Sequence, residues 1–264
     1  MIRIDVLASG SSGNALLLRD GDAALLIDAG LSRRALTQRC QALSFELDRL
    51  QDLFVTHEHV DHVRGAPVLA RRHDLRVHAT EHTLQAIPWD AKFCATRAPL
   101  RAREPVHVGP MEITAFDISH DAAAPVCYRI RFSDGRVLGL ATDLGVVTGE
   151  VEQALSECDV LGIEANHDVA MLRDGPYPWH LKKRIASELG HLSNDEAAVL
   201  VERVATPRLR RVLGLHVSEH NNTPVLARQA LEGALRRRGV RAPVTVVEQR
   251  RSVSVETAVQ QALL

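Results

Sequence analysis

Short apolar segments separated by turn-forming residues recur along the whole chain and predict a protein rich in β-strands. Apolar runs bounded by Gly, Ser, Asn or Asp are typical of strands. Asp134 and Gly135 stand between two such runs and predict a hairpin turn. We expect strands at residues 2–7, 15–18, 23–27, 53–55, 75–78, 113–116, 126–132, 137–141, 160–164, 212–215 and 244–247.

Helical periodicity appears in fewer segments. Apolar residues recur at intervals of three or four, as on one face of a helix, at residues 31–43, 65–73, 180–189, 193–204 and 224–238. Ser32 and Ser193 are placed to cap two of these helices. No internal repeat and no Pro/Ser-rich linker interrupts the pattern. We therefore expect one domain over residues 1–264, of the α+β class, with two β-rich halves covered by helices.

The composition is that of an ordinary globular protein. Hydrophobic residues make up 45% of the 264 positions and charged residues 25%, which excludes disordered, collagen-like and coiled-coil chains. Lys and Arg together number 32 and Asp and Glu 33, so the net charge is −1. Overall charge therefore cannot hold nucleic acid, and any such contact needs a local patch. Aromatic residues are 3%, which disfavours an extended base-stacking platform.

Cysteine usage and the first residues bear on the compartment. None of the cysteines forms a CxxC pair, and we expect them to be reduced and mostly buried: Cys40, Cys94, Cys127 and Cys158. Arg3 and Asp5 carry charge where a signal peptide needs an apolar core, and no run of 18 apolar residues occurs. These features predict a cytoplasmic protein without membrane contact.

A dense cluster of metal-binding side chains is the strongest chemical signal. The sequence Thr-His-Glu-His-Val-Asp-His at residues 56–62 follows the apolar run 53–55 directly. In an extended backbone His57 and His59 point the same way, while Asp61 and His62 turn toward a second point. Imidazole nitrogens with a carboxylate suit divalent transition metals. A solvated turn is the alternative, but the position at a strand end favours a site.

This HxHxDH sequence resembles the metal-binding signature of the metallo-β-lactamase fold. The resemblance implies an αββα sandwich of two mixed β-sheets flanked by helices. It also implies further ligands downstream, and His120, Asp143 and His216 match them, each near the end of an expected strand. In the implied assignment, one metal is held by His57, His59 and His120, the other by Asp61, His62 and His216, and Asp143 bridges the two.

Two divalent metal ions in such a centre would supply hydrolytic chemistry. A shared water has its pKa lowered from about 15.7 toward 7, so hydroxide forms at neutral pH and serves as the nucleophile between the metals. Zn and Mn both suit these ligands, and Fe is possible. Asp61 is expected to act in catalysis as well as in metal binding. An aspartate bridge favours phosphate esters as substrates.

A wider set of motifs resembles the YycJ/WalJ family of metallo-hydrolases. The motifs are GSSGN at 10–14, THEHVDH at 56–62, ATDLG at 141–145, EANHD at 164–168, GHLSN at 190–194 and HVSEHNN at 216–222. Val60 and Val217 depart from the usual residues of the family without touching a ligand. The resemblance implies a 5′-to-3′ DNA exonuclease linked to mismatch repair, with the PhnP-type cyclic phosphodiesterases as its nearest cousins.

Further residues are expected around the substrate. By resemblance to the phosphodiesterases, His191 contacts the scissile phosphate and donates a proton or hydrogen bond to the leaving oxygen. A surface histidine beside a helix start is the alternative. Glu164 is expected to orient a ligand histidine. The residues expected on the substrate side are Ser11, Asn14, His167, His191, Ser218 and Asn222.

Several alternatives remain open at this level. A small-molecule cyclic phosphodiesterase of the PhnP type fits the near-neutral charge, and a thioester hydrolase or a non-catalytic metal-binding scaffold is less favoured. The basic residues 182–184 form either the rim of a phosphate groove or a solvated face. The segments 244–255 and 258–264 pack either on the core or on a second subunit, as in a homodimer. The expected partner is a phosphodiester substrate, DNA before others.

Overall fold

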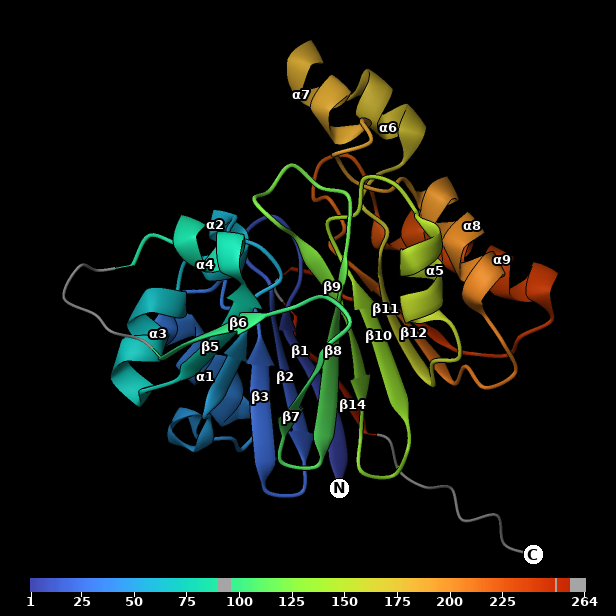
Figure 1. Ribbon diagram of the computed structural model, residues 1–264. Helices are drawn as coiled ribbons and strands as arrows, with labels where there is room; N and C mark the ends of the chain where they lie inside the picture. The colour runs from blue at the N-terminus through green and yellow to red at the C-terminus, as the bar shows by residue number, and fades with distance from the viewer. Residues whose placement is uncertain (90–95, 250, 257–264) are drawn as a thin grey trace, which may run out of the picture.

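Two seven-stranded β-sheets lie face to face at the centre of the molecule (Figure 1). The computed structural model describes residues 1–89, 96–249 and 251–256. The first sheet has the order β14-β1-β2-β3-β4-β5-β6 and the second the order β13-β12-β11-β10-β9-β8-β7. The strands of the first sheet are β1 (Ile2–Ala8), β2 (Ala15–Asp20), β3 (Ala23–Ile27), β4 (Asp52–Phe54), β5 (Arg76–Thr80), β6 (Thr96–Leu100) and β14 (Val253–Glu256).

Each sheet combines an antiparallel and a parallel part. Strands β14, β1, β2 and β3 pair antiparallel, whereas β3 to β6 are parallel. In the second sheet β7 to β10 are antiparallel and β10 to β13 are parallel. Its strands are β7 (Pro105–Val108), β8 (Met111–Asp117), β9 (Val126–Arg131), β10 (Val137–Ala141), β11 (Val160–Glu164), β12 (Arg211–Leu215) and β13 (Val244–Val246). Parallel strands end at the same edge of a sheet, so the loops after β3, β4, β10, β11 and β12 gather there.

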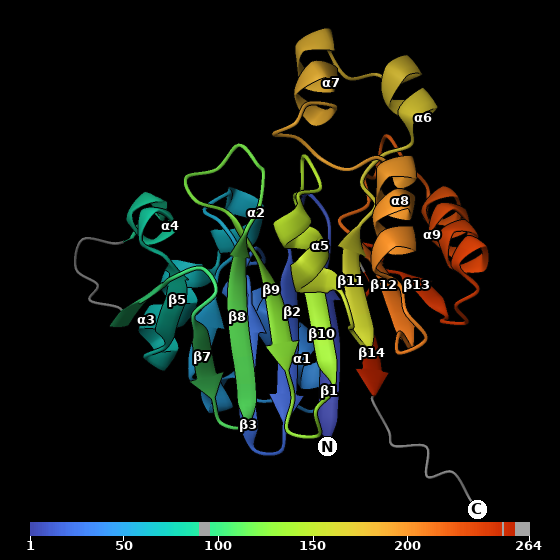
Figure 2. The same cartoon turned by 45° about the vertical axis from the view of Figure 1, so that its right-hand side comes forward.

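Helices cover the outer faces of both sheets (Figures 1 and 2). On the first sheet lie α1 (Arg33–Ala42), the 3-10 turn Leu47–Arg49, α2 (Val60–Val63), α3 (Ala66–His73) and α4 (Glu81–Ala86). On the second lie α5 (Gly149–Leu155), α8 (Asn194–Val204) and α9 (Pro224–Arg238). This arrangement is the expected αββα sandwich. No helix among the described residues is both long enough and apolar enough to span a bilayer.

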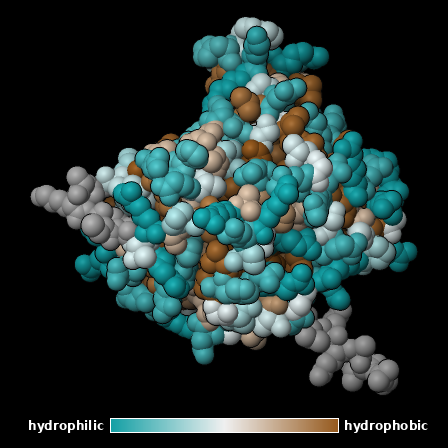
Figure 3. Space-filling model, viewed as in Figure 1, coloured by the Kyte–Doolittle hydropathy of each residue, from teal (hydrophilic) through white to brown (hydrophobic). Residues whose placement is uncertain are grey.

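Helices α6 (Val169–Asp174) and α7 (Trp179–Ile185) form a projection beyond the strand ends (Figure 2). Hydrophobic side chains gather where this projection meets the body of the molecule (Figure 3). The prediction of a helix over 180–189 is wrong at its end, because the chain turns after Ile185. The Gly190 N–H donates to the Ser187 carbonyl and the His191 N–H to the Ile185 carbonyl, which directs His191 back toward the body.

The apolar core forms one layer between the sheets and one under each set of helices. Tyr128 on β9 is fully buried between the sheets, and its hydroxyl donates to the Val55 carbonyl at 2.7 Å. This bond fixes the backbone immediately before the histidine cluster. Cys40, Cys127 and Cys158 are buried free thiols, and Cys94 lies outside the described residues. Burial raises the pKa of the Cys127 thiol to about 12, so it is unreactive near neutral pH.

The C-terminal segment packs on the core as far as it is described. Val253–Glu256 forms β14, which pairs with β1 so that Arg3 lies opposite Glu256. Val255 is buried between the sheets. Residues 258–264, which the sequence left open between the core and a second subunit, lie outside the described residues.

Candidate metal centre

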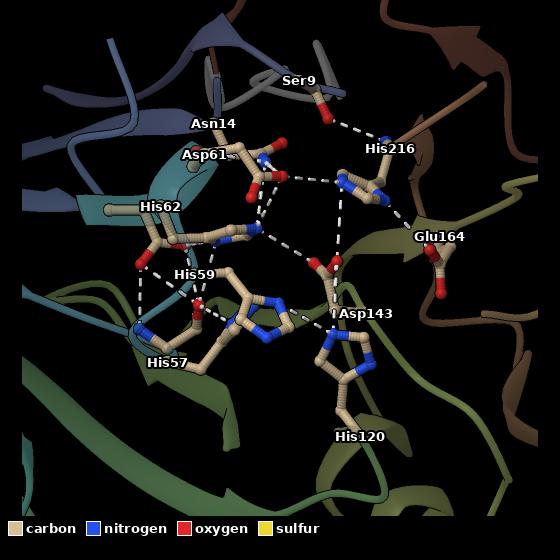
Figure 4. Close-up of polar contacts among 12 residues, drawn as sticks. Ser9, Asn14, His57, His59, Asp61, His62, His120, Asp143, Glu164 and His216 are labelled. Carbon is tan, nitrogen blue, oxygen red and sulfur yellow. Dashed lines mark hydrogen bonds and ion pairs between the residues drawn. The ribbon is translucent and has the colours of Figure 1, made fainter. Parts of the chain in front are cut away.

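The structure brings all seven expected metal ligands to one edge of the sandwich (Figure 4). Each follows a strand: the histidine cluster follows β4, His120 follows β8, Asp143 follows β10 and His216 follows β12. Four side-chain groups each have potential ligand atoms within 4.8 Å of one another. Two of these groups are the expected trios: His57, His59 and His120 in one, and Asp61, His62 and His216 in the other.

Asp143 lies between the two trios. Its Oδ2 is 3.2 Å from His62 Nε2, and its Oδ1 is 3.5 Å from His216 Nε2 and 4.0 Å from His120 Nε2. The side chain is 2% exposed, so a full negative charge is held inside the protein. Although burial alone raises the pKa of Asp143, the nearby charges of His216 and His62 hold it well below its usual value.

Unusual backbone conformations aim several of these side chains. Asp143 and His216 have positive φ angles, +58° and +50°, which residues other than Gly rarely adopt. Such strain persists only where the surroundings hold it. Here the His216 N–H donates to the Ser9 hydroxyl at 2.8 Å. Gly30 is required for a related reason, because a Cβ at Gly30 would lie 1.6 Å from the Asp61 carbonyl oxygen.

Asp28, which the sequence analysis did not identify, orients His62. Its Oδ2 lies 2.8 Å from His62 Nδ1, and its Oδ1 accepts the Thr56 backbone N–H at 2.8 Å. With Nδ1 bound in this way, His62 turns Nε2 toward Asp143. Asp28 directly follows β3 at the same sheet edge, and it also has a positive φ of +59°. Its place directly after an apolar strand is the one sequence feature it has, and that feature does not indicate His62 as its partner.

Glu164 holds two histidines at once. Its Oε1 lies 2.8 Å from His191 Nδ1 and 3.1 Å from His216 Nδ1. Its Oε2 accepts the Leu144 N–H at 2.9 Å, which ties it to the loop carrying Asp143. Burial opposes ionisation, but the charge of His191 and the hydrogen bonds lower the pKa of Glu164 to about 2. The carboxylate therefore stays charged and fixes both rings.

The first trio contains an imidazole nitrogen without a partner. His57 is fully buried, and its Nε2 has no hydrogen-bond partner. His120 Nδ1 is held 3.0 Å from the Gly190 carbonyl, and its Nε2 lies 3.3 Å from His59 Nδ1. A buried unpaired nitrogen costs about 1–3 kcal/mol, so an arrangement of this kind needs a further partner. Divalent metal ions satisfy several such nitrogens together, and the residues present therefore fit metals.

The expected substrate residues are distributed around this centre. His191 lies at the cluster, its ring stacked on His216 with centroids 5.2 Å apart. Asn14 also lies there, its Nδ2 3.0 Å from His62 Nε2. The rest lie further away. Ser11 is exposed on the 10–14 loop, Ser218 and Asn222 line a neighbouring cavity of about 420 Å³, and His167 lines a cavity beneath α6 and α7.

The local hydrogen bonds explain the positions of Ser218 and Asn222. The Ser218 hydroxyl accepts the Asn221 N–H at 3.1 Å. The Asn222 amide donates to the Ala165 carbonyl and pairs with the Asn194 side chain, both at 2.9 Å. These two residues therefore shape the loop after His216. The contacts described for them do not reach the metal cluster.

Changing Asp28 to Asn is expected to weaken metal binding by roughly 10- to 100-fold. The carboxylate fixes His62 Nδ1 and raises the basicity of Nε2, and loss of such supporting groups has effects of this size. Metal affinity measured by competition with a chelator checks the prediction. Asp48→Asn, at a carboxyl that is 88% exposed, is the matched control and is expected to bind metal normally. Unchanged affinity in Asp28→Asn would contradict the assigned role.

Metal binding is expected to release about one to two protons near pH 7.5, because ligand imidazoles must be neutral. Burial disfavours charge on His216 and His62, but Asp143 and the other carboxylates outweigh it. The pKa of His216 is raised to about 10, and that of His62 is also raised. Both rings are thus protonated before metal binds, and affinity should rise with pH up to about 10. Calorimetry in two buffers of different ionisation enthalpy measures this release, and a value of zero would contradict it.

Comparison with known proteins agrees with this geometry. The family described as the beta-lactamase superfamily domain matches residues 24–217. Exodeoxyribonuclease YycJ of Bacillus anthracis is 37% identical over 245 residues, which cover 90% of this chain and 90% of the relative. Exodeoxyribonuclease WalJ of Streptococcus pneumoniae serotype 2 (strain D39 / NCTC 7466) is 36% identical over 238 residues, 88% of each chain.

Solved structures share the whole architecture. The metallo-beta-lactamase fold protein YhfI from Bacillus subtilis superposes with a TM-score of 0.73 at 15% identity, covering 96% of this chain and 99% of that chain. Zn(2+)-bound PqqB from Methylobacterium extorquens superposes with a TM-score of 0.70 at 18% identity, covering 95% of this chain and 99% of that chain. At these identities the likeness concerns the fold, which is confirmed. The chain therefore belongs to the beta-lactamase superfamily and is a metal-dependent hydrolase of the metallo-β-lactamase fold, homologous to the YycJ and WalJ exodeoxyribonucleases.

Proposed function

We propose that this protein is a DNA exonuclease that hydrolyses phosphodiester bonds from the 5′ end at a dinuclear metal centre. The convergence of the two ligand trios on Asp143 is the observation that carries this proposal. The exodeoxyribonuclease activity named for both relatives at 36–37% identity supports DNA as the substrate. The nine-tenths coverage extends this support to the loops around the site.

Seven side chains would hold the metals in this proposal. One ion would be held by His57, His59 and His120, the other by Asp61, His62 and His216, with Asp143 between them. Two divalent ions bound there, Zn or Mn, would lower the pKa of water and polarise the phosphate. Within the second trio, Asp61 Oδ2 lies 3.5 Å from His216 Nε2. The same oxygen lies 3.4 Å from Asn14 Nδ2. Asn14 thus keeps the Asp61 carboxylate turned toward the cluster.

His191 would supply the proton for the leaving oxygen. Its Nδ1 is held by Glu164, which leaves Nε2–H as the group that can face a substrate. Burial disfavours the charged ring, but Glu164 and Asp143 outweigh this and raise the pKa of His191. These carboxylates favour the protonated ring, which is the form that can donate. A general acid in this position donates to the oxygen on which negative charge develops as the P–O bond breaks.

A basic stretch on α7 borders the centre and would contact the DNA backbone. Lys182, Lys183 and Arg184 occupy the last turn of this helix. Arg184 Nε lies 2.5 Å from Asp121 Oδ2, and Asp121 directly follows His120. The Arg184 side chain is 52% exposed, so part of the guanidinium remains available to a phosphate. This local patch would supply the positive charge for phosphate binding that the net charge of −1 cannot provide.

Hydrolysis of two substrates side by side tests the proposal. The first is bis(p-nitrophenyl) phosphate, and the second is single- and double-stranded DNA labelled at the 5′ or the 3′ end. Both are tested with added Zn or Mn, and Asp61→Ala is the blank. Stepwise loss of the 5′ label as mononucleotide, absent in the variant, is the expected result. Turnover of the small ester alone would favour a small-molecule phosphodiesterase instead.

A further inference from the structure

A second cavity lies beside the metal centre, beneath the projection formed by α6 and α7. It has a volume of about 450 Å³, within the range of small-ligand pockets. Its wall includes His167, Val169, Leu172, Trp179, Lys182 and Lys183. None of these residues belongs to the metal-binding trios. The brown side chains at the base of the projection in Figure 3 show the same apolar character on the surface.

His167 lines this cavity and carries a buried polar atom without a partner. The residue is 3% exposed, and its Nδ1 has no hydrogen-bond partner. Its backbone is fixed, because its carbonyl accepts the Asn194 N–H at 2.8 Å and it forms a bridge with Ser193. Burial lowers the pKa of His167, so the ring is neutral and offers one donor and one acceptor. Leaving such a nitrogen unpaired costs about 1–3 kcal/mol.

An aromatic side chain stands at the same cavity without being buried. Trp179 is 77% exposed and Val169 is 53% exposed, although both are large and apolar. Lys182 and Lys183 follow Trp179 on α7 and add positive charge. Glu196 also lines the cavity, but its carboxylate accepts the Ser193 N–H and hydroxyl at 2.8 and 2.7 Å. An exposed indole ring next to ammonium groups is the combination that binds unstacked bases together with their phosphates.

The cavity is close enough to the metal centre to hold part of the same substrate. His167 pairs with Ser193, and His191 lies two residues before Ser193. Two extended residues span about 7 Å. One step along a strand covers about 3.4 Å where the bases are stacked and more where they are not. A base in the cavity would therefore belong to a nucleotide within about one to three positions of the bond at the metal centre.

We infer that this cavity binds one unstacked nucleobase of the strand that is cut. Trp179 stacks on the base, the neutral His167 ring offers a hydrogen bond to its edge, and Lys182 and Lys183 contact the adjoining phosphates. The inference rests on the proposed DNA substrate. It implies that the enzyme holds a single strand beside the bond it cuts, since a paired and stacked base cannot enter the cavity.

Fluorescence of Trp179 tests the inference directly. The chain has two tryptophans, so Trp89→Phe leaves Trp179 as the only indole reporter. The metal-loaded protein is titrated with the probe, a 5′-phosphorylated single strand of DNA of 12 nucleotides. Phosphorothioate linkages at its 5′ end prevent cutting, and a gel confirms that the strand stays intact. Matched strands carry one abasic residue at position one, two, three or nine, which removes a base but keeps every phosphate.

We expect quenching of Trp179 by the unmodified strand. An abasic residue at one of the first three positions should weaken binding by about 5- to 100-fold, the range for loss of one stacked base. The abasic residue at position nine should have no effect. Trp179→Ala, tested by anisotropy of a labelled strand, should bind all strands alike, whereas Trp179→Phe should retain the discrimination. Val225→Ala, at a 61% exposed apolar position on α9, is the control.

Two results would overturn the inference. One is equal binding of all the abasic strands by the protein that carries Trp179. The other is absence of quenching by any DNA strand, which would show that Trp179 does not stack on a base. Failure of the proposed function looks different. If DNA quenches Trp179 in a base-dependent way but is never hydrolysed, the exonuclease proposal is wrong and the inference that the cavity binds a base is supported. If DNA is hydrolysed but the abasic strands bind equally, the inference that the cavity binds a base is wrong and the exonuclease proposal is supported.

Discussion

Replacing Asp143 by Ala is expected to lower phosphodiester hydrolysis by about a thousandfold or more. The carboxylate lies between the two trios and within 4.0 Å of His62, His120 and His216. Its removal takes away the carboxylate that we expect to join the two metal positions. Metal assistance is worth several kcal/mol, and each 1.36 kcal/mol is tenfold in rate.

Metal content measured together with activity distinguishes this effect from misfolding. We expect fewer than two metals per chain in Asp143→Ala, with an unchanged circular dichroism spectrum. Asp134→Ala is the control, because Asp134 sits in the β9–β10 turn at the opposite end of β10 from Asp143. A variant that binds two metals and keeps its activity would show that Asp143 does not join the two positions.

The second large effect is expected from His191→Ala, with a loss of roughly 10²- to 10⁴-fold in kcat and no loss of metal. General acid catalysis contributes rate factors of this size. The pKa of His191 is raised, and if this ring is the proposed proton donor, the wild-type rate should fall as pH rises through that pKa. The variant should lose this alkaline limb. Rate–pH profiles and metal analysis of the same preparations provide the measurement.

The same experiment distinguishes a role of His191 as proton donor from a role as metal ligand. Asp143, Glu164, His191 and His216 form one of the groups that could hold a metal ion. If His191→Ala loses a metal as well as activity, His191 is a ligand and not the proton donor. His82→Ala, at an exposed histidine on α4, is the matched control and should leave both rate and metal content unchanged.

The elements that could be predicted are those whose pattern is local. The ranges of β3, β10, β11 and α9 match the expected segments, because each is a continuous apolar or periodic run closed by a turn or cap. Strand β14 was missed because its partner β1 lies some 250 residues away in sequence. Strand β6 was missed because it is a largely exposed edge strand containing Pro99. Such elements depend on tertiary pairing.

In the site, too, features with a local sequence pattern could be predicted and features that depend on tertiary contacts could not. The clustering of the expected ligand residues could be predicted because the family motif fixes residue types in order along the chain. Asp28 escaped notice because a single acid carries no motif, and its role appears only when β3 and β4 lie side by side. The position of Asn222 in a buried amide pair with Asn194 likewise depends on contacts 28 residues apart. Neither could be read from spacing alone.

The measurement that tests the central claim most directly is a metal titration of DNA hydrolysis. Protein freed of metal with a chelator receives Zn or Mn in steps, and release of the 5′ label is followed at each step. We expect no cleavage without metal and full activity at two equivalents per chain. Cleavage that persists in metal-free protein, or two bound metals with no hydrolysis of any phosphodiester, would contradict this expectation.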